Sequence, residues 1–335
     1  MSATFDKYKS EQPNKFAWNY GDDRELPRIH AETVLLHVRF KDELELMGLS
    51  PQYALFRSVT QLKYGATWEK AFYLTGNCIR KHLKRQEENA GGSGTYQLMK
   101  EIFQNYLSCL KHGSQFFYQT LPFVFEKWFE MATTVLGIDE KLRAMESGES
   151  QRCTQAGLDN YNRIKEYFVE ITEKQIQRVV HTLQPYQLLV VFPQLISRIC
   201  HSHDMVFKTL TQIIVHVMKQ FPQQTFWQMM QVSNSSSQRR RQRYDQIKAA
   251  FKRATSDENW TLLKAFSQLS DQLIKICQHK VEPGTNMLSL NHHFRPLEKM
   301  MTSPAFPKII LPFKDSLYPM LPNDAAMQVR TVRLL

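Results

Sequence analysis

Glycine and proline, the residues that most often form turns, are scarce in this sequence. The chain of 335 residues contains 12 glycines and 14 prolines, a smaller combined share than the roughly 12% of average proteins. So few turn residues argue against a sandwich or barrel of many short strands. Hydrophobic residues make up 42% of the chain, which excludes a chain disordered throughout.

Paired cysteines and long apolar runs are also absent. The five cysteines are scattered without a CxxC pair, which argues against a disulfide framework or a zinc ribbon. No apolar run approaches the roughly 18 residues that span a bilayer. The first ten residues lack the apolar stretch of a signal peptide. We therefore expect a soluble, intracellular protein with no membrane partner.

The positive charge of the chain is concentrated in one stretch. The net charge is +11, and residues 231–254 contain seven arginines and lysines against the single acid Asp245. More than half of the excess charge therefore lies in a segment that is predicted to form one helix.

Residues that begin and end helices recur from residue 50 onward. Ser50 and Pro51 suit the N-cap and first position of a helix, and Gly113 is placed to end another. Apolar residues at spacings of three to five predict one long helix from Tyr161 to Leu183. Pro185 opens a further helix, in which Pro193 is expected to cause a kink or a break. Other helices are predicted over residues 115–136 (ended by Gly137), 204–220, 222–232, 238–254 and 260–277, and a polar loop over residues 139–157.

About ten helices joined by short connections predict an all-α fold, an α-solenoid of antiparallel helix pairs with degenerate repeats. We expect this solenoid to occupy residues 51–278. Residues 1–50 are assigned poorly. Prolines recur in residues 279–335, an irregular segment whose one strand candidate is residues 308–313.

Two motifs carry a resemblance to a known family. PQLISRI at residues 193–199 is followed by PQQTFW at residues 222–227, by a Val-x-Ser-x-Ser turn from Val232, and by the basic helix. This order resembles the FAT region of the phosphatidylinositol-kinase-related protein kinases, most closely their ATR-like checkpoint branch. The resemblance is strong over residues 186–240 and looser over the rest of residues 68–322.

The resemblance implies a solenoid that braces a kinase in a nuclear enzyme of DNA-damage signalling. Its implied partners are the kinase domain of the same polypeptide, an ATR-interacting protein and activators. Family catalysis needs loops of the D-x-H-x-x-N and D-F-G type, and neither pattern occurs in this sequence. We therefore expect a non-catalytic fragment without a cofactor of its own; ATP and magnesium belong to the missing kinase domain, toward which residues 279–335 would lead.

The basic helix at residues 238–254 leaves several interpretations open. A solvated helix face is the first, a nuclear-import signal the second, and contact with nucleic-acid phosphates the third, although no aromatic alternation suggests base stacking. The alternative function is accordingly an autonomous α-helical adaptor or nucleic-acid-binding protein. The candidate contact residues are Arg239, Arg240, Arg241 and Arg243.

The two motifs are predicted to pack the helices rather than to bind a ligand. A groove for a partner helix is the alternative, since solenoid faces bind partners. His201 and His203 are read as a helix end and not as metal ligands, because two histidines two positions apart point to different sides of a helix. The packing residues are Pro193, Gln194, Leu195, Ile199, Pro222 and Trp227.

Overall fold

The computed structural model is helical throughout the residues that it describes, with no strand among them. The strand candidate at residues 308–313 lies mostly outside the described residues. No described helix is long and apolar enough to cross a membrane. The described residues are 25–43, 49–62, 65–89, 94–147, 154–281, 288–303 and 306–309.

The chain forms two compact units. The first comprises Met1–Val191 and Ser202–Thr209, and the second comprises Phe192–His201 and Leu210–Leu335. The boundary therefore falls within two helices, α9 (Pro185–Ser197) and α10 (Asp204–Gln220).

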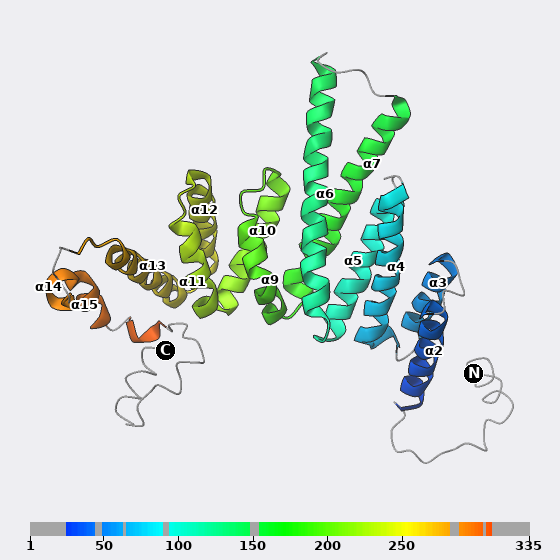
Figure 1. The fold of residues 1–335 in the computed structure, drawn as a ribbon, viewed down its shortest axis with the longest axis horizontal. Coiled ribbons are helices and arrows are strands. Elements are labelled where there is room, and N and C mark those ends of the chain that lie inside the picture. The colour runs from blue at the N-terminus through cyan, green and yellow to red at the C-terminus, as the bar shows by residue number, and fades with distance from the viewer. Residues whose placement is uncertain are drawn as a thin grey trace. The chain divides into compact units, whose positions relative to one another are not determined.

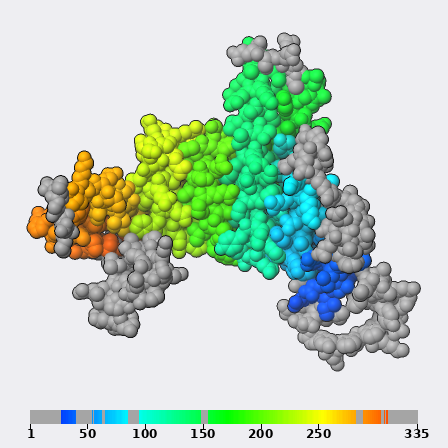
Figure 2. Space-filling model, in the orientation of Figure 1, coloured from blue at the N-terminus to red at the C-terminus, as the bar shows by residue number. Residues whose placement is uncertain are grey.

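Helices of the first unit pack on their neighbours in sequence (Figure 1). Each of the helices from α2 to α7 contacts the next, and α5 also contacts α7. In Figure 2 the side chains of α4, α5 and α6 fill the gaps between the ribbons. This nearest-neighbour packing is the arrangement of a helical-repeat protein. The bounds are α2 (Glu25–Glu43), α3 (Leu49–Gln61), α4 (Glu69–Asn89), α5 (Gly94–His112), α6 (Phe117–Glu146) and α7 (Gln155–Ile171).

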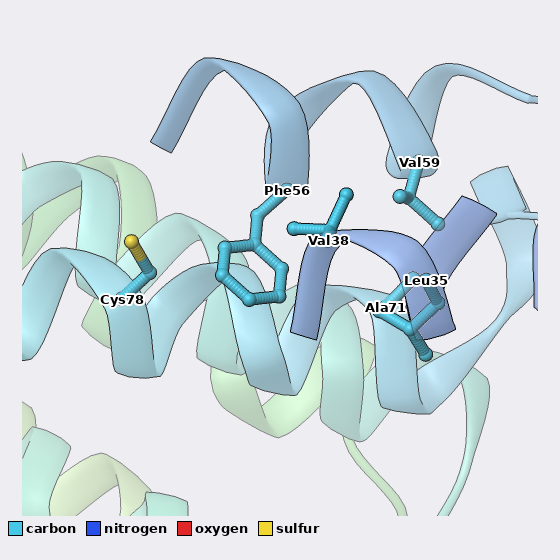
Figure 3. Packing of buried hydrophobic residues seen from close by; sticks show 6 residues of the cluster. All are labelled: Leu35, Val38, Phe56, Val59, Ala71 and Cys78. Carbon is cyan, nitrogen blue, oxygen red and sulfur yellow. The ribbon is translucent and has the colours of Figure 1, made fainter. Parts of the chain in front are cut away.

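The apolar faces of α2, α3 and α4 meet in one buried cluster (Figure 3). Thr75 on α4 is also buried, and its hydroxyl donates to the carbonyl oxygens of Ala71, at 2.7 Å, and Phe56, at 3.2 Å. Its polar atom therefore does not weaken the apolar contact. The cluster consists of Leu35 and Val38 from α2, Phe56 and Val59 from α3, and Ala71 and Cys78 from α4.

The prediction that Gly137 ends a helix is wrong, because α6 continues to Glu146. A glycine inside a helix costs only about 1 kcal/mol, and buried Val135 and Ile138 on either side of it keep the apolar face continuous. Asp139, predicted to lie in a loop, forms an ion pair with Lys165 of α7, with 2.7 Å between Oδ1 and Nζ. Residues 139–146 are therefore helical, and α7 already begins at Gln155.

The long helix predicted from Tyr161 to Leu183 is interrupted. Its middle is a π-helical turn, Thr172–Ile176, and the short α8 (Val179–Thr182) follows. The interval of five between Ile171 and Ile176 corresponds to this wider turn, and both residues are fully buried. The Trp128 indole donates to the Thr172 hydroxyl at 2.9 Å, which holds the turn against α6.

A buried glutamine completes the end of α5. Gln187 on α9 is 1% exposed; its Nε2 donates to the carbonyl oxygens of Leu110 (3.1 Å) and Gly113 (3.0 Å), and its Oε1 accepts from the Gln184 amide (3.0 Å). The last carbonyls of a helix lack partners within it, so this side chain supplies them. Gly113 follows the end of α5, as predicted.

The second unit is built around α11 (Pro222–Ser233), α12 (Gln238–Ala254) and α13 (Asp257–Cys277). Phe226 of α11 lies edge-on to Phe251 of α12 and to Phe266 of α13, with ring centroids 5.6 and 5.4 Å apart. Edge-to-face pairs of this kind add to the stabilisation from apolar burial. Helix α13 begins before the predicted Trp260 because Ser256 caps it by accepting from the Asn259 amide. The remaining elements are α14 (Leu290–His293), α15 (Arg295–Met301) and the 3-10 turn η3 (Phe306–Lys308).

Replacing Gln187 with leucine is expected to destabilise the fold by about 2–4 kcal/mol, because the buried Leu110 carbonyl oxygen, the part-buried Gly113 carbonyl oxygen and the Gln184 amide lose their partner. Urea unfolding followed by circular dichroism measures the change. The control is Gln184→Leu, which alters an exposed side chain three residues earlier and keeps the backbone amide. Equal stability of the two variants would contradict the capping role of Gln187.

Candidate functional site

The basic helix α12 begins where the sequence predicts. Ser237 is its N-cap, with the hydroxyl accepting from the Arg240 amide at 3.5 Å. Arg241 bends back over the preceding turn and donates through Nη1 to the carbonyl oxygens of Ser235 and Ser236. The serine-rich break and the first arginines therefore form one local structure.

Burial divides α12 into two faces. Tyr244, Ile247 and Phe251 are buried against the rest of the second unit, at the spacing of an amphipathic helix. Arg239 and Arg241 are exposed, and Arg240 and Arg243 are half-buried. Arg243 also donates to the Gln246 side chain at 3.1 Å. Four of the seven basic residues of α12 are thus exposed, and the other three are half-buried at the edge of the core.

Three lysines surround one indole at the other end of α12. The Nζ atoms of Lys248, Lys252 and Lys264 lie 6.0, 5.5 and 5.4 Å from the ring centroid of Trp260. Lys252 and Lys264 are exposed, whereas Lys248 and Trp260 are half-buried. Sequence reasoning missed this group, because two of its members come from α13. The pairs at spacing four, Lys248 with Lys252 and Trp260 with Lys264, are the signal that could have identified it.

The family-motif residues occupy different environments. Leu195 and Ile199 are fully buried, whereas Pro193 is exposed within α9, which runs through it without a break in helical assignment. Pro222 occupies the start of α11. Trp227 is half-buried, and its ring centroid lies 5.0 Å from that of Phe266. Gln194 is also half-buried. The structure therefore uses the aliphatic members as core and leaves the prolines nearer the surface.

The histidine pair lies at the start of α10. The His203 ring packs edge-on against Phe168, with centroids 4.8 Å apart. Burial lowers the pKa of His203, while the charges of Asp139 and Asp204 act in the opposite direction. Within the described ranges no three His, Cys, Asp or Glu side chains converge as metal ligands.

Comparison with known proteins identifies the repeats. Residues 171–270 match a family model described as "Serine/threonine-protein kinase ATR-like, HEAT repeats". In this region the chain is similar to the helical repeats of ATR-like kinases. Because the match is to HEAT repeats, the predicted all-α solenoid is confirmed. The matched part of the ATR-like kinases is their helical-repeat region, in agreement with the prediction that this segment is non-catalytic. The finer FAT-type boundaries at residues 51 and 278 stay a prediction.

Similarity to ATR-like kinases extends over most of the chain. The protein named serine/threonine-protein kinase ATR of Arabidopsis thaliana is 29% identical over 315 residues, which are 87% of this chain and 11% of the relative. The rice protein of the same name (Oryza sativa subsp. indica) is 26% identical over 324 residues, or 88% and 11%. Protein kinase rad3 of Schizosaccharomyces pombe is 26% identical over 230 residues, or 66% and 9%. The ATR-like chain thus spans about a tenth of the length of these curated relatives.

Two buried tyrosines of the ATR-like segment predict opposite responses to loss of the hydroxyl. Burial raises the pKa of Tyr106 and of Tyr244 to about 12, so both stay neutral phenols. The Tyr106 hydroxyl donates to Asn77 at 2.6 Å, whereas the Tyr244 hydroxyl has no partner among the described residues. We expect Tyr106→Phe to lower the unfolding free energy by about 1 kcal/mol and Tyr244→Phe to leave it unchanged or raise it. Thermal denaturation of the two variants measures this; a larger loss in Tyr244→Phe would contradict it.

Proposed function

We propose that this chain is a scaffold portion of an ATR-like serine/threonine kinase, which braces and regulates the kinase domain of the same polypeptide in DNA-damage checkpoint signalling. The observation that carries the proposal is the HEAT-repeat match at residues 171–270. It is supported by relatives that are named as kinases and that are about ten times longer than the part they share with this chain.

The packing of the helices suits a mechanical role. Each helix of the first unit buries its apolar face on its sequence neighbours. Polar contacts between side chains of different helices add to this packing. Lys100 of α5 pairs with Glu170 of α7 at 2.7 Å, and this pairing, with that of Lys174, lowers the pKa of Glu170. In such an array each repeat contacts only its neighbours, which suits a segment that passes a displacement from one helix to the next.

The proposed partners and cellular compartment rest on the similarity to ATR-like kinases. The partners are the kinase domain, an ATR-interacting protein and activators, and the compartment is the nucleus. The arginines at the start of α12, Arg239, Arg240, Arg241 and Arg243, are candidates for a nuclear-import signal. Similarity over 88% of the chain to one kinase favours this scaffold over an autonomous adaptor.

Phe226→Ala in the full kinase polypeptide tests the bracing role. Phe226 is fully buried between Phe251 and Phe266, so its truncation removes about 3–5 kcal/mol from the second unit. We expect limited proteolysis to show opening of α11–α13 and phosphorylation of a peptide substrate to fall together with it.

The matched control is Gln224→Ala, an exposed position two residues earlier on α11, which should preserve both protection and activity. If α11–α13 open in the Phe226→Ala protein while basal and activator-stimulated activity remain at the wild-type level, the segment does not brace the kinase.

A further inference from the structure

The three lysines around Trp260 concentrate positive charge outside the buried core of the second unit. Trp260 is only half-buried, and Lys252 and Lys264 are exposed. Lys248 also lies 5.8 Å from the buried Tyr244 ring. Within the described part of the chain, none of the three ammonium groups has a carboxylate at ion-pair distance.

Like charges at this separation oppose one another. Lys248 and Lys252 are four residues apart on one helix, an arrangement that destabilises a helix by a few tenths of a kcal/mol. Contact with the indole offsets this repulsion, since an exposed cation–π pair contributes about 0.5–1 kcal/mol. The acids of the two helices are Asp245, Asp257, Glu258 and Asp271, and Glu258 is engaged by Lys308 at 3.3 Å. An anion placed among the lysines would remove their mutual repulsion.

The charge continues along α12 as a row. Positions 241, 248 and 252 are separated by seven and four residues, and therefore share one helical face over about 17 Å. Arg241 keeps its charge, because its contacts to Ser235 and Ser236 are with neutral carbonyl groups. A ligand matching this row must carry several negative charges along its length.

We propose that Trp260, Lys248, Lys252 and Lys264, continued by Arg241, bind single-stranded nucleic acid. Lysines act as point charges toward phosphates, whereas phosphorylated and acidic peptides are recognised mainly by the bidentate fork of arginine. Proteins that bind single strands combine cations, which neutralise the phosphates of the nucleic acid, with aromatic rings such as an indole, on which unpaired bases stack. The extended row fits a polymer of phosphates better than one phosphate group. The aromatic residues of α12, Tyr244 and Phe251, are buried, so the accessible aromatic side chain is supplied by α13.

The test measures fluorescence anisotropy of a labelled oligothymidine on the full 335-residue chain between about 50 and 200 mM salt. Replacing Lys248, Lys252 and Lys264 with glutamine is expected to weaken binding and to reduce the slope of log affinity against log salt by about 2. Trp260→Leu should weaken binding about tenfold to a hundredfold and leave the slope unchanged, while Trp260→Phe should retain most of the affinity.

The control removes the same charge elsewhere. Lys208, Lys219 and Lys275 are exposed lysines outside the row, and the triple glutamine variant at these positions should bind as wild type. Circular dichroism establishes that each variant is folded.

The proposal fails if the chain does not bind the oligonucleotide at low salt, or if both triple variants bind alike. It also fails if a duplex binds as well as the single strand and Trp260→Leu has no effect, or if a phosphoserine peptide binds through these lysines and the oligonucleotide does not. None of these results bears on the bracing of a kinase.

Discussion

The structure depends on one constraint: a helix with a single apolar face must cover that face with the helix next to it in sequence. The cluster shared by α2, α3 and α4 satisfies the constraint with aliphatic side chains, and the three phenylalanines of α11, α12 and α13 satisfy it with aromatic ones. Some buried polar side chains, such as Thr75, lie within a helix, and one, Gln187, serves the end of a neighbouring helix. Gln187 supplies the carbonyls after α5, so the junctions are completed by side chains from other helices.

Sequence patterns predicted helices best where a polar break precedes the apolar periodicity. Residues 204–220 and 238–254 are helical to the residue. The prediction is wrong at Gly137, because the apolar face that continues through Val135 and Ile138 outweighs the low helix propensity of glycine. The interval of five between Ile171 and Ile176 marks a change of hydrogen-bond pattern, which apolar spacing alone does not distinguish from a continuous α-helix.

The candidate site was only partly visible in the sequence. The basic character of α12 and the cap at Ser237 could be predicted from composition and motif. The convergence of lysines on Trp260 could not be, because it requires α13 to fold back after Ser256. The resemblance to ATR-like kinases was visible in the motifs around Pro193 and Pro222. It is supported by the HEAT-repeat match and by the similarity to kinases of plants and fungi.

The π-helical turn at Thr172–Ile176 has a consequence for how such repeats change in length. One added residue in an ordinary α-helix rotates everything beyond it by about 100° and would turn the apolar face away from its neighbours. A wider turn absorbs that residue locally, so that Ile171 and Ile176 both face inward and are fully buried. Thr172 completes the arrangement by donating to Phe168 and accepting from Trp128. A single insertion can therefore be accommodated within one repeat while the phase of the flanking helices is preserved.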